Sequence, residues 1–338
     1  MTSKPILWMR KHQKLTALFF FGGLFVLLNI MAFMHAYKML HFVGKGVKTK
    51  AAFALSPLEK VGVIFTGIKV PKPENAETPE AWKMAYETHR FESGKGVELE
   101  AWHIPVEHSK AMVIIFHGYA ASKATCLSIA KAYNDLGYST FLVDFRGSGG
   151  SSGNTTTIGM AEGEDVAKSL DYVRAHFPNQ PVVLHGVSMG AASILKAIAS
   201  NGAKPDLIVL EAVFDRMLTT TGHRFTAMGA PEFPGARILI FWGSVQIGYW
   251  GFAHNPVEYA KEVHCPALVM HGGRDPLARP EEAKNVFENL AGPKEFELFP
   301  GISHDTCVRP DASRWKGFVS TFLDQHLAAR PAIIAEKN

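Results

Sequence analysis

The longest apolar stretch of the chain lies near its N-terminus. Residues 15–34 read LTALFFFGGLFVLLNIMAFM and carry no charged side chain. At about 1.5 Å per residue, a helix of this length covers the roughly 30 Å of a bilayer's hydrocarbon core. Only Thr16 and Asn29 have polar side chains, whereas a soluble helix normally shows a polar face. The pattern therefore predicts a transmembrane helix, with a buried core helix as the alternative.

The flanks of this helix favour an uncleaved anchor over a secretory signal peptide. A signal peptide has a shorter apolar core and a small-x-small cleavage site, but here the sequence continues Met34-His35-Ala36-Tyr37-Lys38. We therefore expect a membrane protein with one N-terminal span. Its orientation stays open, because the basic residues that normally set it are balanced: Lys4, Arg10, Lys11 and Lys14 precede the span, and Lys38, Lys45, Lys48 and Lys50 follow it.

Farther along, short apolar runs alternate with amphipathic stretches of helical length. This alternation predicts an α/β fold with a parallel sheet covered on both faces and ligands at the carboxyl ends of the strands. Residues 90–104, interrupted by Ser93-Gly94-Lys95-Gly96, predict a hairpin that leads into the sheet. The expected strands are 97–104, 112–116, 140–145, 182–187, 207–213, 267–271 and 295–299, and the clearest helices are 158–176 and 188–200.

These patterns divide the chain into three parts. Residues 1–50 form a tail and the anchor, residues 51–92 a connector with a proline-rich break, and residues 93–338 one folded domain. Within that domain, residues 216–264 interrupt the alternation of strands and helices.

The amino-acid composition excludes several classes of protein. The 338 residues are 47% hydrophobic and 20% charged, which suits a globular core. Basic residues outnumber acidic ones by 35 to 31, but eight of them lie in residues 1–50, and the remainder holds 27 basic and 31 acidic residues. No basic footprint for nucleic acid is left. Cys126, Cys265 and Cys307 are too few and too scattered for a disulfide framework or a zinc site.

The strongest chemical signal is Gly186-Val187-Ser188-Met189-Gly190, which follows an apolar strand and opens a helix rich in small residues. A serine on a sharp strand-to-helix turn needs glycines two positions before and after it, because side chains there would collide with the neighbouring strand and helix. Such a turn exposes the hydroxyl, so Ser188 is the predicted nucleophile.

A nucleophilic serine needs a base, and the base needs an acid that orients it. His304 follows the last expected strand, and Asp275 lies in Gly272-Gly273-Arg274-Asp275-Pro276, also just past a strand. The order Ser188, Asp275, His304 is the order found on hydrolase sheets. Asp215 is a rival acid, and Asp275 has the alternative role of capping a turn, but its glycine-flanked loop favours Asp275.

Acyl transfer also requires donors for the developing oxyanion. The backbone N–H of Met189, which follows the nucleophile, is one candidate. The second is the backbone N–H of Tyr119, in the His117-Gly118-Tyr119-Ala120 loop after strand 112–116.

Two further patterns have structural interpretations. His117, His185 and His271 each precede a glycine at a strand end, but no carboxylate accompanies them, so we expect packed, hydrogen-bonded histidines and no metal. The glycine-rich loop 144–153 lacks the Lys-Ser/Thr ending of a phosphate-binding loop. We expect Asp144 and Arg146 to hold its shape.

Together these motifs resemble the α/β-hydrolase superfamily over about residues 90–328, nearest to its monoglyceride-lipase-like, lysophospholipase-like and serine-aminopeptidase-like branch. The resemblance implies an eight-stranded, mostly parallel sheet, a Ser-His-Asp triad, an acyl-enzyme intermediate and no cofactor. It also implies that residues 216–264 form a cap over the site. The aromatic residues of this cap suit an acyl-chain pocket, a lipid-facing surface or the cap's own core: Phe225, Phe233, Phe241, Trp242, Tyr249, Trp250, Phe252 and Tyr259.

The predicted function is a membrane-anchored serine hydrolase for small-molecule or lipid esters or thioesters with an acyl chain. A serine aminopeptidase is the first alternative; it would need carboxylates for the substrate's ammonium group, and the cap offers Glu232, Glu258 and Glu262. The second alternative is a catalytically silent hydrolase fold that serves as a membrane scaffold. Such proteins have usually lost a triad residue, whereas all three are present here.

Overall fold

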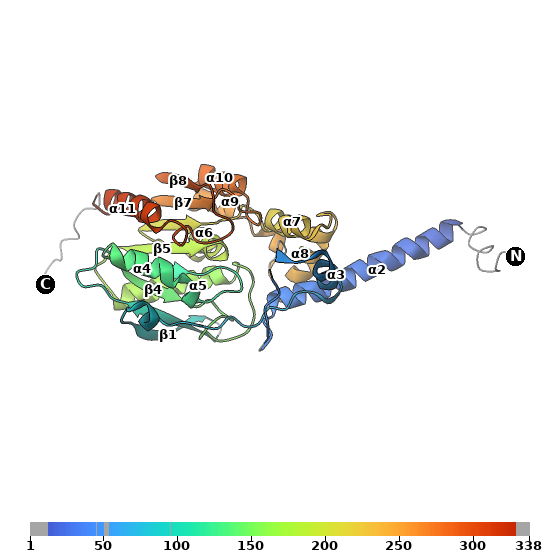
Figure 1. The fold of residues 1–338 in the computed structure, drawn as a ribbon, viewed down its shortest axis with the longest axis horizontal. Coiled ribbons are helices and arrows are strands. Elements are labelled where there is room, and N and C mark those ends of the chain that lie inside the picture. The colour runs from blue at the N-terminus through green and yellow to red at the C-terminus, as the bar shows by residue number, and fades with distance from the viewer. Residues whose placement is uncertain (1–12, 45, 51–53, 95, 329–338) are drawn as a thin grey trace.

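A layered body and one long projecting helix make up the computed structural model (Figure 1). The structure describes residues 13–44, 46–50, 54–94 and 96–328. Of the charges that flank the expected span, Lys4, Arg10, Lys11 and Lys45 lie outside these residues.

The body is built on an eight-stranded sheet with the order β1-β2-β4-β3-β5-β6-β7-β8. Strands β1 and β2 pair antiparallel, β2 pairs antiparallel with β4, and every other neighbouring pair is parallel. The expected fold class is therefore confirmed. The strands are β1 (Glu87–Gly94), β2 (Val97–Ile104), β3 (Met112–Phe116), β4 (Ser139–Val143), β5 (Val182–Val187), β6 (Leu207–Glu211), β7 (Ala267–Gly272) and β8 (Lys294–Phe299).

Helices cover both faces of this sheet. Alternate residues of β3 belong to two separate hydrophobic clusters, one on each face. One cluster includes residues of α5 (Glu162–His176), α6 (Met189–Asn201) and α10 (Pro280–Asn289), and the other includes residues of α4 (Leu127–Asp135) and α11 (Ala312–Ala328). Because β3 is buried on both faces, its sequence MVIIF is apolar throughout.

Two elements are shorter than the apolar pattern predicts, because polar residues hold the neighbouring backbone outside them. Strand β4 ends at Val143, before the expected 145, and Asp144 begins the glycine-rich loop. Helix α5 begins at Glu162 and not at 158, because the Glu162 carboxylate accepts hydrogen bonds from the backbone N–H groups of Thr157 and Gly159, which hold the preceding residues in a turn.

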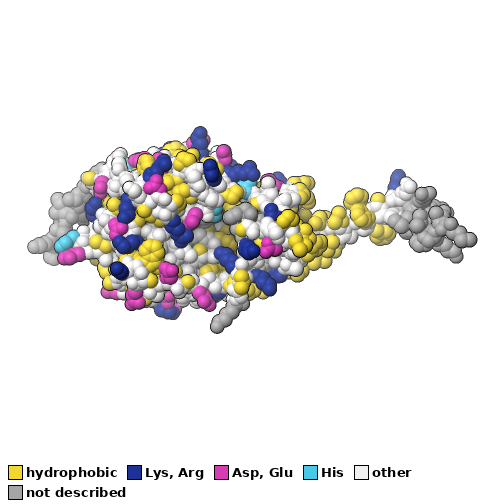
Figure 2. All heavy atoms as spheres, viewed as in Figure 1, with side chains coloured by type: hydrophobic (Ala, Val, Ile, Leu, Met, Phe, Trp, Pro, Cys, Tyr) yellow, Lys and Arg dark blue, Asp and Glu magenta, His cyan; other side chains and the backbone are white. Residues whose placement is uncertain are grey.

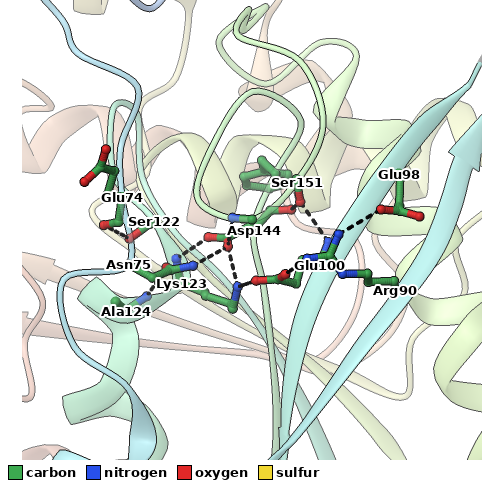
Figure 3. A network of polar contacts seen from close by, with 12 residues as sticks. Glu74, Asn75, Arg90, Glu98, Glu100, Ser122, Lys123, Ala124, Asp144 and Ser151 are labelled. Carbon is green, nitrogen blue, oxygen red and sulfur yellow. Dashed lines mark hydrogen bonds and ion pairs between the residues drawn. The ribbon is translucent and has the colours of Figure 1, made fainter. Parts of the chain in front are cut away.

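The glycine-rich loop is held by a buried ionic network (Figure 3). The Lys123 ammonium is fully buried and pairs with Asp144 and, at 2.7 Å, with Glu100. Asp144 also accepts hydrogen bonds from Gly150 N at 2.9 Å and from Asn75 Nδ2 at 2.8 Å. These contacts give Asp144 the structural role that the sequence suggested. They also tie the expected connector to the body, since Asn75 belongs to residues 51–92.

The N-terminal helix α2 extends over Gln13–Leu40, beyond both ends of the expected span. It is the one helix of the described residues that is long and apolar enough to cross a membrane, and its most apolar 18-residue window is entirely unburied. Helix α3 (Pro57–Thr66) follows, started by a Ser56–Glu59 capping box, and then the short 3₁₀ helix η2 (Pro79–Trp82).

The insertion between β6 and β7 contains α7 (Met217–Met228), α8 (Gly235–Ile247) and the 3₁₀ helix η4 (Gly251–Ala253). Helix α9 (Pro256–Tyr259) and the 3₁₀ helix η5 (Ala260–Glu262) follow. Val257, Ala260 and Val263 belong to the same core cluster as residues of α6 and α10. The end of the expected cap is therefore part of the body.

Candidate active site

Ser188 occupies the sharp turn between β5 and α6. Its backbone has φ 53° and ψ −110°, a conformation that L-residues rarely adopt. A Cβ at Gly190 would lie 2.3 Å from the Phe116 carbonyl oxygen, and one at Gly186 would lie 2.5 Å from the Gly190 carbonyl carbon. Only glycine fits at these two positions, which explains the motif around the serine.

The structure brings Ser188, His304 and Asp275 together in one chain of hydrogen bonds. Ser188 Oγ lies 3.1 Å from His304 Nε2, and His304 Nδ1 lies 2.6 Å from Asp275 Oδ2. Each residue sits on the loop or turn just after a strand, namely β5, β8 and β7, so the parallel sheet places all three at one edge.

Asp275 is buried but well supplied with donors. Burial alone would raise the pKa of the Asp275 carboxyl, but hydrogen bonds from His304, Ala278 N and Leu277 N outweigh burial and lower it. Asp275 is therefore ionised at neutral pH. The rival acid Asp215 instead contacts Arg216 at 2.9 Å and Asn285 at 3.2 Å.

The two candidate oxyanion donors belong to segments that adjoin the serine. Met189 is the first residue of α6, so its N–H is at the helix N-terminus. In the second segment, a Cβ added to Gly118 would lie 3.7 Å from Ser188 Cβ and 3.5 Å from the Val187 carbonyl oxygen. The loop that carries Tyr119 therefore runs directly against the nucleophile.

The three strand-end histidines occupy separate hydrogen-bonding sites. His117 Nε2 accepts from Phe145 N at 3.1 Å, His185 Nδ1 lies 2.9 Å from the Tyr133 hydroxyl, and His271 Nε2 lies 2.8 Å from the Ala278 carbonyl oxygen.

Glu211, at the end of β6, is a buried acid that the sequence analysis did not single out. Its carboxylate accepts from Cys307 N at 2.8 Å and from Trp315 Nε1 at 2.6 Å. Through Cys307 it holds the loop that carries His304. The signal was present in the sequence, because Glu211 ends the otherwise apolar run LIVLE.

A cavity of about 760 Å³ extends from Ser188 and His304. The cap contributes mainly apolar side chains to its wall, including Phe225, Met228, Ile238 and Leu239. Of the described residues in the wall, Asp305 is the one acidic side chain, whereas five are basic: Lys48, Lys50, Lys69, Arg224 and Arg309. The cavity suits an apolar ligand with a neutral or anionic polar end.

The cap aromatics have mixed roles. Phe225 lines the cavity, and Phe252 packs against a small cluster where the cap meets the body. Trp242 contacts α2, while Phe233, Phe241 and Trp250 are exposed.

Comparisons with known proteins agree with this architecture. Residues 107–221 match a family described as serine aminopeptidase, S33. The chain is 24% identical to the uncharacterized protein YqkD of Bacillus subtilis, over 69% of this chain and 77% of that protein. It is 23% identical to lysophosphatidylserine lipase ABHD12 of Mus musculus, over 81% of this chain and 71% of that protein.

Among solved structures, the Pyrococcus furiosus esterase Pf2001 superposes with a TM-score of 0.64 at 22% sequence identity. The match covers 75% of this chain and 96% of the esterase. The strand order, the elbow between β5 and α6 and these similarities show that the chain belongs to the α/β-hydrolase superfamily.

Proposed function

We propose that the protein is a membrane-anchored serine hydrolase that cleaves carboxylic esters or thioesters carrying an acyl chain. The observation that carries this proposal is the hydrogen-bonded chain from Ser188 through His304 to Asp275, located in the wall of a large, mostly apolar cavity. Geometry of this kind activates a hydroxyl, and the cavity offers space for an acyl group beside it.

In the first half-reaction, Ser188 Oγ attacks the acyl carbonyl carbon while His304 Nε2 accepts the hydroxyl proton. Ionised Asp275 holds His304 in the tautomer that leaves Nε2 free to accept, and it stabilises the imidazolium that forms. The backbone N–H groups of Met189 and Tyr119 donate to the oxyanion. His304 then protonates the leaving alcohol or thiol as the carbonyl re-forms, which leaves an acyl group on Ser188.

In the second half-reaction, a water molecule replaces the alcohol. His304 takes a proton from the water as its oxygen attacks the acyl-serine carbonyl. Collapse of the resulting tetrahedral intermediate releases the carboxylic acid and returns the proton to Ser188 Oγ.

Two observations support membrane anchoring. The apolar window of α2 is unburied, as expected for a segment that faces lipid. The C-terminal part of the same helix packs on the body, where Ala36 and Leu40 are buried. A cleaved signal peptide has no reason to complete the folded domain, so this packing favours a retained anchor.

The family match to serine aminopeptidases makes a peptidase the second candidate. That reaction requires negative charge near the site to bind the substrate's α-ammonium group. Glu232, Glu258 and Glu262 are absent from the cavity wall, which instead carries lysines and arginines. The charge of the cavity therefore favours the ester.

The test is labelling with a fluorophosphonate probe in detergent, which modifies activated serines covalently. We expect the wild-type chain and Ser193→Ala to be labelled, and Ser188→Ala to be unlabelled while keeping its near-ultraviolet circular dichroism. Ser193 is a matched control because it lies one turn farther along α6 and donates to the Met189 carbonyl oxygen. Labelling of Ser188→Ala, or a folded wild type that resists the probe, would overturn the proposal and favour the silent scaffold.

A further inference from the structure

The anchor helix takes part in the cavity itself. Five residues of α2 line it, at the helical spacing that places side chains on one face: Leu28, Met31, Ala32, His35 and Met39. Helix α3 adds Val63 and Ile64 to the same wall. The cavity that contains Ser188 is therefore closed on one side by the segment expected to sit in the membrane.

A neighbouring stripe of α2 fixes the helix to the cap. Asn29 Oδ1 accepts from Trp242 Nε1 of α8 at 3.0 Å, and the Phe33 ring meets Trp242 edge-on with ring centroids 5.4 Å apart. One turn farther along, the backbone of Gly243 approaches Ala36 and Leu40. Contacts on two adjacent stripes set the rotation of α2 about its axis, so the cavity stripe faces inward.

The same helix also touches the loop that carries a candidate oxyanion donor. The Tyr119 hydroxyl donates to the Met39 carbonyl oxygen at 2.7 Å. Just beyond α2, Lys48 Nζ donates to the Ala120 carbonyl oxygen at 2.7 Å, and the Phe42 ring packs near Tyr119. The end of the anchor is thus joined directly to the catalytic loop.

Exposed apolar side chains surround the base of α2. Figure 2 shows hydrophobic side chains along the projecting helix and around the point where it meets the body. Several large apolar side chains of α3 and the cap are exposed, and a gathering of such side chains is typical of a surface that contacts lipid. They are Leu58, Val61 and Phe65 on α3, and Phe233, Phe241, Val245 and Trp250 of the cap.

Helix length then sets the depth of the cavity relative to the bilayer. The uncharged stretch 15–34 spans about 30 Å, which equals the hydrocarbon thickness. Leu28, Met31 and Ala32 lie within the last part of this stretch. The side of the cavity that they form is consequently at the depth of the acyl chains in the adjacent leaflet.

We propose that α2 is a wall of the acyl-binding site, and that a single-chain lipid ester reaches Ser188 directly from the bilayer, between α2, α3 and α8. This inference rests on the proposed hydrolase function, and it names the source and the path of the substrate. An acyl chain that moves along α2 stays in apolar surroundings until its ester reaches Ser188, so its transfer needs no passage through water.

Two matched substitutions test this wall. Met31→Trp fills the cavity, whereas Met34→Trp adds the same volume on the exposed side of α2, where Met34 is 49% exposed and absent from the cavity wall. Each variant of the full chain is placed in phosphatidylcholine vesicles. Its kcat/KM is measured with a membrane-embedded sixteen-carbon monoacylglycerol and with the water-soluble ester 4-nitrophenyl acetate.

We expect Met31→Trp to lower kcat/KM for the monoacylglycerol at least tenfold and to leave acetate hydrolysis within twofold. Met34→Trp should match the wild type with both substrates. Equal behaviour of the two variants with the monoacylglycerol would overturn the proposal. An equal loss with both esters would also overturn it, because that result indicates a general disturbance of the site.

A second readout separates this proposal from the proposed function. A sixteen-carbon fatty acid with a photoreactive diazirine close to its carboxylate, the end expected next to position 188, is cross-linked to Ser188→Ala in vesicles, and labelled peptides of the body are identified by mass spectrometry. Labelling of the peptide that contains Val187, lost in Ser188→Ala/Met31→Trp and kept in Ser188→Ala/Met34→Trp, supports the wall even if no ester is cleaved. Absence of body labelling overturns it.

Discussion

At the scale of single residues, Arg224 is notable because its positive charge lies in the cavity wall without a direct ion pair among the described residues. It projects from α7 into the cavity wall and donates to the backbone oxygen and Oγ1 of Thr220. No carboxylate lies within ion-pair distance of it among the residues that the structure describes. Burial lowers the pKa of its guanidinium, yet arginine stays charged in proteins. Asp275 and Glu282 interact with this charge only at longer range, so a cationic group without a direct ion pair in an apolar cavity favours ligands with an anionic group.

We therefore expect Arg224→Met to discriminate between substrates. The substitution keeps an apolar stem but removes the charge-assisted hydrogen bonds, each of which is worth about 1.5–3 kcal/mol, or roughly ten- to a hundredfold in affinity. The kcat/KM for a monoacylglycerol phosphate should fall by that factor relative to the kcat/KM for the neutral monoacylglycerol. Arg237→Met on α8 is the control, since Arg237 is exposed and outside the cavity wall. An equal effect on both substrates would assign Arg224 a packing role only.

At the scale of elements, the turn between β5 and α6 depends on close backbone packing. Gly190→Ala would place a methyl group against the Phe116 and His117 carbonyl oxygens, at 2.3 and 2.9 Å, so α6 must move away from β3. We expect a loss of about 1–3 kcal/mol in the free energy of unfolding. A shift of about 1 Å in the nucleophile typically costs about a hundredfold in rate, so kcat/KM should fall by that order.

The matched control for this substitution is Gly317→Ala in α11. Gly317 is exposed and helical, and an added Cβ there meets nothing within 4 Å. Alanine is preferred over glycine in helices by about 1 kcal/mol, so this variant should unfold at a slightly higher temperature and keep full activity. Wild-type kcat/KM in Gly190→Ala would show that the turn tolerates displacement and would contradict the argument.

The elements were predictable where burial and sequence pattern coincide. Strand β3 is buried on both faces, and its apolar run marks it from end to end. The turn at Ser188 was predictable because close backbone contacts require glycine at the two positions that flank it, Gly186 and Gly190. The ends of strands were harder to predict. Asp144 and Phe145 leave the sheet because they form hydrogen bonds with residues distant in the sequence, and an apolar run does not reveal those bonds.

The role of α2 in the cavity was beyond the sequence pattern for a physical reason. Apolar side chains suit contact with lipid and contact with a bound acyl chain equally well. The sequence of an apolar helix therefore does not show which of its faces lines the site. The sequence also gives no sign that Arg224 lines the cavity, because an isolated arginine on a helix normally indicates a solvent-exposed surface. Its position in the cavity wall arises only when the cap folds over the body.

At the scale of the whole molecule, buried ionisable groups make stability depend on pH. His185 is fully buried beside the Tyr133 hydroxyl, with its Nε2 atom 3.5 Å from Glu211 Oε1. Burial lowers the pKa of His185 to about 3, from 6.5 in the unfolded chain. The native state therefore binds fewer protons than the unfolded state between these values, so stability falls as the pH drops below about 6.5.

Glu211 acts in the opposite direction. Burial raises the pKa of its carboxyl to about 7, from 4.5, so its contribution to stability falls as the pH rises through this range. Because the two groups oppose each other, the pH profile of the wild type alone does not isolate either one. A variant that removes only the histidine titration is needed.

His185→Gln supplies that variant, since a glutamine amide can still accept from Tyr133. At about 1.4 kcal/mol per pKa unit, the wild type should lose roughly 2 kcal/mol more than His185→Gln between pH 7.5 and pH 5. Denaturant titration in mild detergent measures both profiles. His108→Gln is the control, because the His108 side chain is 92% exposed, and its profile should parallel the wild type. Parallel profiles for His185→Gln and the wild type would mean that water or a neighbouring carboxylate stabilises the protonated imidazole in the native core.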